Sequence, residues 1–215
     1  METWFVPDHM KQLANMSTKI FGIDQQGLVT YDFDHLGFRT GKTEGQSNLC
    51  LIGNTISFGL GIHYIHTFGS LVASDLNLKL KNLSFGCYLH ENHDHIVNIK
   101  NSIIQSNDDV FLIQINNLDR KRVSADLVVS GNDASYCVKR FVDYFEQVDD
   151  LLKHHKKLYL YWDNVSYDLP KTIRDQISVL NKCHIDTSLP VDLNTFGIKS
   201  HNLIAKIISS KLKIT

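Results

Sequence analysis

The sequence predicts an α/β fold, a three-layer α/β/α sandwich with a central parallel sheet of about five strands. From residue 49 onward, short apolar runs of strand character alternate with longer amphipathic stretches, which is the order that successive β–α units produce. The run DVFLIQI at 109–115 is almost continuously apolar, as expected for a strand that helices cover on both faces. Together these two features predict a parallel sheet covered by helices.

The expected elements follow one another regularly along the chain. Strands are expected at 49–53, 80–86, 109–115, 157–162 and 183–189. Helices are expected at 67–76, 93–105, 170–180 and 200–212, with a longer one whose apolar stripe runs from Val138 to Leu152. Pro170 suits the first turn of its helix, where a missing N–H costs nothing, and Ser200 is placed to cap the last helix.

The extent of the β–α repeat predicts the domain organisation, and the charge of the chain bears on its partners. Residues 1–45 lie outside the repeat, so we expect them to form an N-terminal extension packed on a domain of residues 46–215. A net charge of -1 gives no electrostatic reason to expect nucleic acid or an anionic membrane as a partner. No segment approaches the ~20 apolar residues that cross a bilayer, and the first residues do not resemble a secretory leader. We therefore expect a cytoplasmic protein with reduced cysteines and no cofactor, and the oligomeric state stays open.

One edge of the predicted sheet is the place to look for a functional site. Loops that follow parallel strands gather at a single edge, where α/β proteins build their sites. In this chain those loops begin near Gly53, Gly86, Asn116, Trp162 and Leu189. Trp162 either lines a substrate pocket there or packs at the edge of the core.

The first of these loops carries a recognisable motif. IGNTISFGLG at 52–61 runs from a strand into a glycine-bounded turn that presents a hydroxyl residue before a helix. It resembles the first block of the SGNH (GDSL-like) hydrolases, in which Gly-Asp-Ser precedes an apolar residue, Ser or Thr, an aromatic residue and Gly. In this resemblance Gly53 matches the glycine, Asn54 takes the aspartate position and Thr55 takes the position of the nucleophilic serine.

Later segments resemble the other blocks of that family in the right order. NLSFG at 82–86 is similar to the second block, whose glycine N–H helps to bind the oxyanion, and this implies that role for Gly86. VFLIQINNLDR at 110–120 occupies the place of the third block, so Asn116 or Asn117 would supply a side-chain donor. YDFDHLGFRT at 31–40 is similar to an Asn-x-x-Gly-Phe-Arg stretch found ahead of the first block.

The last block departs most from the family pattern. DLNTFGIKSHNLIA at 192–205 resembles Asp-x-x-His ahead of the terminal helix, with Asp192 in the aspartate position and Thr195 in place of the catalytic histidine. His201 lies nearby, and it either acts near the site edge or packs at the start of the last helix. The resemblance covers residues 31 to 212 and implies the flavodoxin-like SGNH fold.

The resemblance implies acyl chemistry with a changed set of groups. In the family, serine attacks an ester or thioester carbonyl, histidine accepts its proton, aspartate orients the histidine, and backbone and Asn donors stabilise the oxyanion. Thr55 can replace the serine only if a base lies near it. The sequence therefore predicts a hydrolase or acyltransferase for a small-molecule or carrier-bound acyl substrate, or else a binding protein that keeps the pocket without the reaction.

A histidine cluster offers a further alternative, a changed reaction in the same pocket at His90–His95, such as a metal-assisted or condensation step. HENHDH at 90–95 follows the second strand, so His90 is expected at the site edge as a substrate contact or a replacement base. The same cluster has the residue types of a metal site, and it also suits a polar loop that leads into a helix. We expect no metal.

Overall fold

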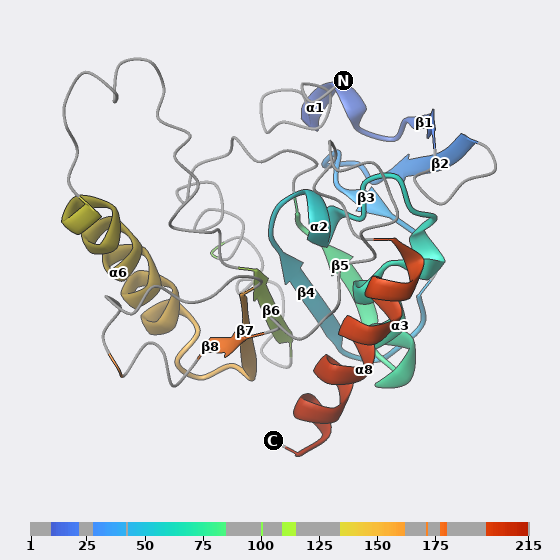
Figure 1. Cartoon of the computed structure of the whole chain (residues 1–215). Helices are drawn as coiled ribbons and strands as arrows, with labels where there is room; N and C mark the ends of the chain where they lie inside the picture. The colour runs from blue at the N-terminus through green and yellow to red at the C-terminus, as the bar shows by residue number, and fades with distance from the viewer. Residues whose placement is uncertain are drawn as a thin grey trace.

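The computed structural model describes residues 10–21, 28–41, 43–84, 100, 109–114, 134–161, 171, 177–179 and 197–214. Its centre is a five-stranded sheet in the order β5-β4-β6-β7-β8, and every neighbouring pair is parallel (Figure 1). The strands are β4 (Asn48–Ile52), β5 (Lys79–Asn82), β6 (Val110–Gln114), β7 (Lys157–Tyr161) and β8 (Ile177–Val179). The predicted fold class is confirmed.

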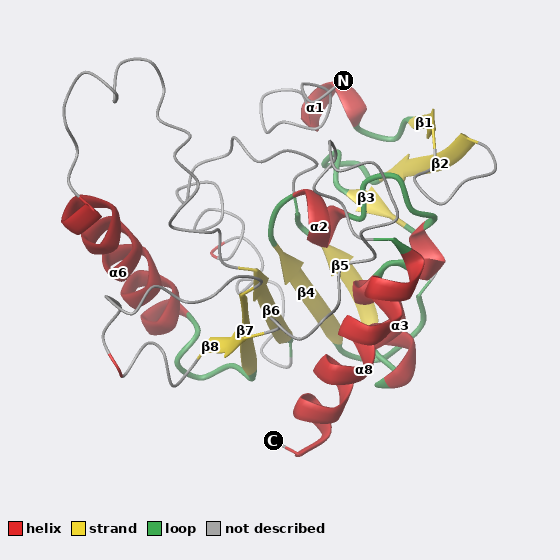
Figure 2. Ribbon diagram, in the orientation of Figure 1, coloured by secondary structure: helices red, strands yellow, loops and turns green. Residues whose placement is uncertain are grey.

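Helices cover both faces of this sheet. Successive residues of each strand point to opposite sides, and in the inner strands the residues on both sides are apolar. On one face α3 (Phe68–Asp75) and α8 (Ile198–Ile214) lie side by side, and on the other lies α6 (Ala134–Leu151) (Figure 2). Leu49 and Leu51 of β4 belong to the first cluster, whereas Cys50 and Ile52 belong to the second. The near-continuous apolar run of each central strand therefore reflects burial on two faces.

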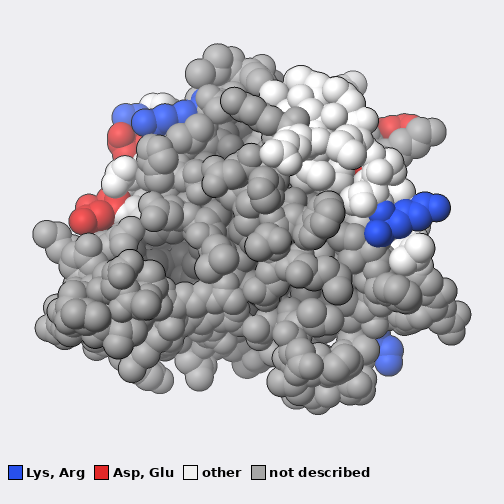
Figure 3. Space-filling model, turned by 90° about the horizontal axis from the view of Figure 1, so that it is seen from above, with Lys and Arg blue, Asp and Glu red and all other residues white. Residues whose placement is uncertain are grey.

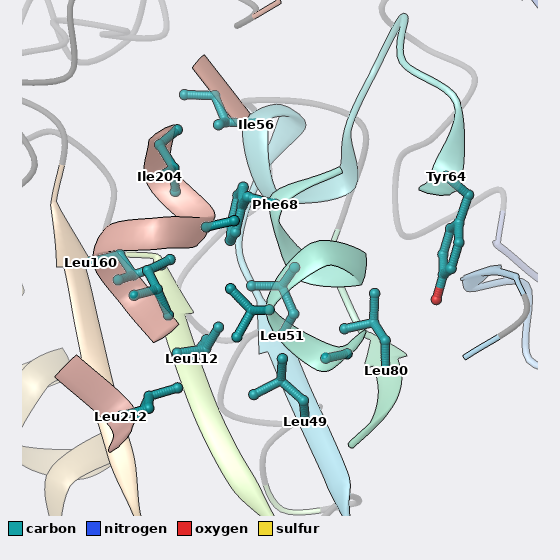
Figure 4. Packing of buried hydrophobic residues seen from close by; sticks show 14 residues of the cluster. Leu49, Leu51, Ile56, Tyr64, Phe68, Leu80, Leu112, Leu160, Ile204 and Leu212 are labelled. Atoms are coloured by element: carbon teal, nitrogen blue, oxygen red, sulfur yellow. The ribbon is translucent and has the colours of Figure 1, made fainter. Parts of the chain in front are cut away.

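The cluster beneath α3 and α8 connects the sheet with the loop that follows β4. Figure 4 shows Leu51 and Leu112 of the strands beneath Phe68 of α3, with Ile204 of α8 beside it. Ile56, from the short helix α2 (Thr55–Phe58), reaches the same cluster and is 7% exposed. Side-chain packing thus holds the residues directly after β4 against the terminal helix.

An antiparallel sheet precedes the parallel one. It consists of β1 (Ser17–Phe21), β2 (Leu28–Phe33) and β3 (Arg39–Thr40), preceded by α1 (Met10–Leu13). Its apolar residues pack around Phe58 at the end of α2, with the Tyr31 ring stacked on it at 5.8 Å between centroids. This part of the N-terminal segment therefore supports the loop that follows β4.

Most predicted elements agree with the structure, and two expectations were wrong. The helix predicted at 170–180 gives way at its end to β8 (Ile177–Val179), because two β-branched residues there pair with β7. Ser200 does not cap α8, which begins at Ile198, and its buried Oγ has no hydrogen-bond partner among the residues that the structure describes. Thr67 does cap α3, with its side chain accepting from the Ser70 N–H.

Two further predicted elements, the helix at 93–105 and the strand at 183–189, lie almost wholly outside the described residues.

None of the described helices has the length and apolar character that crossing a membrane requires.

Candidate functional site at the switch point of the sheet

The strand order places a candidate site between β4 and β6. Numbered along the chain, the five parallel strands lie in the order 2-1-3-4-5, so connections leave β4 and β6 in opposite directions. In such sheets the crevice at the carboxyl ends of these two strands is where ligands bind. The turn from Gly53 to Ser57 follows β4 at this point, and Gln114 is the last residue of β6.

A single buried carboxamide organises this turn. The Gln114 side chain is 1% exposed, and its Oε1 accepts hydrogen bonds from the Ser57 hydroxyl at 2.5 Å and the Ser57 N–H at 3.2 Å. The same oxygen lies 3.4 Å from the Asn54 N–H, and Nε2 donates to Asn54 Oδ1 at 2.7 Å. Asn54 Oδ1 also accepts from the Ile56 N–H at 3.2 Å. Four polar contacts of the turn, two at Asn54 and two at Ser57, thus depend on the last residue of the neighbouring strand.

Gly53 is required by the closeness of that side chain. A Cβ atom at this position would lie 2.5 Å from the Ser57 Oγ and 2.7 Å from the Gln114 Cβ. Both distances are below any normal carbon contact, and the second involves an atom that cannot swing aside. The glycine of the motif is therefore explained by packing against Gln114.

The neighbouring strand β5 supports the turn from the other side. Asn82 Nδ2 donates to the Ser57 carbonyl at 3.3 Å, while Asn82 Oδ1 accepts from the Ser84 N–H at 3.1 Å. Ser84 Oγ donates to the Leu51 carbonyl at 3.2 Å. Asn82, Ser84 and Ser57 are all buried, so these hydrogen bonds form away from bulk water.

A buried arginine holds the next stretch of chain. Arg39 Nη1 donates to the carbonyls of Phe58 and Gly59 at 2.8 and 2.6 Å, and Nη2 donates to the Ile62 carbonyl at 2.5 Å. Its guanidinium also lies 4.2 Å from the centre of the Tyr31 ring, a cation–π distance. Burial lowers the pKa of Arg39 to about 10, which still leaves it charged at neutral pH. Within the described residues its hydrogen bonds go to backbone carbonyls and not to a carboxylate.

His201 is packed between the first turns of two helices. It is 1% exposed, its ring stacks on Phe68 at 5.6 Å, and its Nδ1 accepts the Phe68 N–H at 2.8 Å. Burial, and after it the charge of Arg39, lowers the pKa of His201 to about 3. A neutral ring that accepts at Nδ1 carries its proton on Nε2, so it cannot take up a second proton without losing this bond. These contacts support the packing interpretation of His201.

The structure describes only part of the site that the sequence predicts. Asn54 is buried beside Gln114, Thr55 is the first residue of α2, and His201 belongs to a separate set of contacts with α3. The other predicted site residues lie outside the described residues: Gly86, His90, Asn116, Asn117, Trp162, Asp192 and Thr195. Across the described ranges, no three His, Cys, Asp or Glu side chains gather as metal ligands would.

Sequence reasoning missed the residues that organise the turn. Gln114 ends an otherwise apolar strand, VFLIQ, and a polar side chain at that point was the available signal. Ser57 matched the hydroxyl position of the first block but was not recognised as a partner of Gln114. Arg39 belonged to a noted motif, yet its three carbonyl partners come from residues 58–62 and only folding brings them together.

Comparison with known proteins shows the fold. No protein-family model and no curated protein sequence matches the chain. A carbohydrate esterase is similar at a TM-score of 0.51 and 10% identity, over 93% of this chain and 87% of its own. TesA is similar at a TM-score of 0.49 and 8% identity, over 78% of this chain and 99% of its own. A salicylyl-acyltransferase from a tetracycline biosynthetic pathway is similar at a TM-score of 0.46 and 13% identity, over 82% of this chain and 57% of its own. At 10% identity, the similarity to the carbohydrate esterase shows a shared fold and does not extend to activity or substrate.

Proposed function

We propose that this protein is a hydrolase or acyltransferase of the SGNH type that acts on an ester or thioester acyl group. One observation carries the proposal: the Gly53–Ser57 turn lies at the switch point of the sheet and is held there by buried hydrogen bonds. A fixed strand-to-helix turn at this edge is a suitable place for a nucleophile, because the reacting group must be held in one geometry. Thr55, in the middle of the turn, is the proposed nucleophile.

The proposed reaction needs groups beyond the described residues. The Thr55 hydroxyl attacks the acyl carbonyl and loses its proton to a base, the alcohol or thiol leaves, and water or a second alcohol then takes the acyl group. The Gly86 N–H and the side chain of Asn116 or Asn117 are proposed oxyanion donors, and Trp162 a substrate contact. Since Thr195 replaces the family histidine and His201 is packed on Phe68, we propose His90 or a neighbouring histidine as the base, with Asp192 as the carboxylate that orients it.

Turnover of simple acyl substrates tests this proposal. We expect short-chain p-nitrophenyl esters or an acyl thioester to be hydrolysed, with Thr55→Ala abolishing turnover and Thr55→Ser retaining or raising it. Serine lacks the methyl group that restricts the threonine side chain and crowds its approach. Turnover that survives Thr55→Ala unchanged would remove Thr55 as the nucleophile.

A second candidate function is binding without catalysis. The described side chains of the turn, Asn54, Ile56 and Ser57, include no ionisable group. The carbohydrate esterase that shares the fold has an active site with divergent catalytic and non-catalytic binding functions, so such a site can serve both purposes. If wild-type protein is inert, activity that appears only in the double variant Thr55→Ser with Thr195→His would favour this reading. Thermal stabilisation of the inert protein by an acylated sugar or thioester would support it directly.

A further inference from the structure

We propose that Gln114 is a positioning residue of the acyl site, holding the backbone from Asn54 to Ser57 so that Thr55 is kept at the switch point. This inference rests on the proposed function for its catalytic meaning. Its structural content stands on the contacts of one side chain, which reaches from β6 across to the turn after β4.

The two halves of the Gln114 carboxamide hold opposite ends of the turn. At the far end, Oε1 accepts both the N–H and the hydroxyl of Ser57. At the near end, Nε2 donates to the Asn54 side chain, which in turn accepts the Ile56 N–H. Thr55 lies between these anchored residues, so its backbone follows theirs. The hydroxyl of Ser57 is committed to this role, which separates it from Thr55.

The anchor is rigid because of where Gln114 lies. Ile113 pairs in register with Ile52, so Gln114 comes one residue further along and beside Gly53. β4 and β6 are inner strands with a hydrogen-bonded neighbour on each side, and they are buried on both faces. A side chain fixed at the end of such a strand transmits the position of the sheet to the turn. Misplacing a reacting group by about 1 Å can cost roughly 100-fold in rate.

Only a group that both donates and accepts can make all of these bonds. An ionised carboxylate accepts through both oxygens, so one of them would face Asn54 Oδ1 without a proton between them. A protonated carboxyl group has one donor and one acceptor oxygen and can reproduce the pattern. An apolar side chain of the same length makes none of the bonds and leaves buried polar groups unpaired.

The first test is Gln114→Met, which keeps the length of the side chain and removes its polar atoms. We expect kcat to fall roughly 100-fold with little change in KM, because the effect is on placement and not on substrate contacts. Amide hydrogen exchange should accelerate at Asn54, Ile56 and Ser57, while the Phe111 amide, bonded to the Lys156 carbonyl at the other end of β6, stays protected. Asp109→Asn, at that other end, is the matched control for a buried polar change and should keep the wild-type kcat.

The second test is Gln114→Glu, which adds a pH readout. Burial raises the pKa of a carboxyl group, so the one introduced here should lose its proton well above the usual range. We expect the ratio of variant to wild-type kcat to be near one at low pH and to fall as pH rises through that pKa. A merely structural loss of packing would lower the ratio equally at every pH.

The outcomes separate this inference from the proposed function. Unchanged exchange at Asn54 and Ser57 in Gln114→Met overturns the role of Gln114, whether or not the protein is an enzyme. A wild-type kcat in that variant, or a flat ratio for Gln114→Glu, overturns it as well. If wild-type protein turns over no ester or thioester, the proposed function fails, and faster local exchange in Gln114→Met would still show that Gln114 holds the turn.

Discussion

At each end of the β4–β6 strand pair a buried polar side chain makes hydrogen bonds across to the other strand or its turn, but the two side chains bond in different ways. At the amino ends, Asp109 accepts from the Asn48 N–H at 3.3 Å, from Asn48 Nδ2 at 2.8 Å, and from the Cys50 thiol at 3.5 Å. At the carboxyl ends, Gln114 both donates and accepts. Both side chains lie on or beside β6 and are almost fully buried.

The difference lies in what each end fixes. Asp109 is an acceptor whose donors, within the described part of the chain, come from β4, so it joins two strands that the sheet already pairs. Burial, and after it the charge of Asp109, raises the pKa of Cys50, so its thiol remains a donor. Gln114 instead binds residues beyond the strands and sets the path of a turn. A neutral carboxamide performs this task without placing a charge beside the proposed nucleophile.

The largest expected effect is at the carboxyl end, with Gly53→Ala. The new methyl group would collide with Ser57 and Gln114, so the turn must shift. We expect the free energy of unfolding to fall by about 3 kcal/mol, at the upper end for overpacked sites. Turnover should fall roughly 100-fold, because the turn moves with it. Urea denaturation and ester hydrolysis measure the two effects.

The matched control is Asp109→Asn at the other end of the strand pair. It should lower the free energy of unfolding by about 1 kcal/mol and leave turnover intact. Equal losses of turnover in both variants would contradict the difference between the two ends.

A second effect, which is small near neutral pH and grows in acid, concerns stability, and we expect it to depend on His201. Its pKa is about 3 in the folded protein against 6.5 when unfolded, so the unfolded chain binds more protons between these values. The stability from the neutral ring is fully present above pH 6.5 and declines by about 1.4 kcal/mol per pH unit as the pH falls toward 3. His201→Asn keeps an acceptor for the Phe68 N–H and should flatten the dependence of unfolding free energy on pH. His63→Asn, at an exposed residue, should keep the slope.

The smallest effect is expected for Ser57→Ala. The substitution removes one hydrogen bond, and Gln114 Oε1 keeps the Ser57 N–H as a partner. We therefore expect a loss of about 1 kcal/mol in unfolding free energy with turnover retained. The comparison with Thr55→Ala is the informative one. A loss of turnover as complete as in Thr55→Ala would make Ser57 the nucleophile.

The architecture was largely readable from local patterns. Four of the five strands of the sheet were expected close to where they occur, because strands buried on both faces are short, apolar runs that stand out from amphipathic helices. β8 was missed because three residues, Ile177–Val179, carry too little periodicity to separate a strand from the end of a helix. Its assignment depends on pairing with β7, which is a long-range contact.

The candidate site was readable in outline only. The motif at 52–61 located the turn and the positions of Asn54 and Thr55, because a glycine-bounded turn after a strand is a local feature. His201 was considered as a base or as a packing residue, and its buried contacts with Phe68 support packing. Nothing local could decide that question, since Phe68 is 133 residues away.

What the sequence alone determined, then, is the order of the first four parallel strands, the edge of the sheet that carries the candidate site, and the hydroxyl-bearing turn at Gly53–Ser57. What only the tertiary structure decided is which groups hold that turn. Gln114 is 57 residues from Ser57, and Arg39 is 19 residues from Phe58. Hydrogen bonds of this kind depend on distances of a few tenths of an ångström between distant segments, and packing of the sheet and its helices sets those distances.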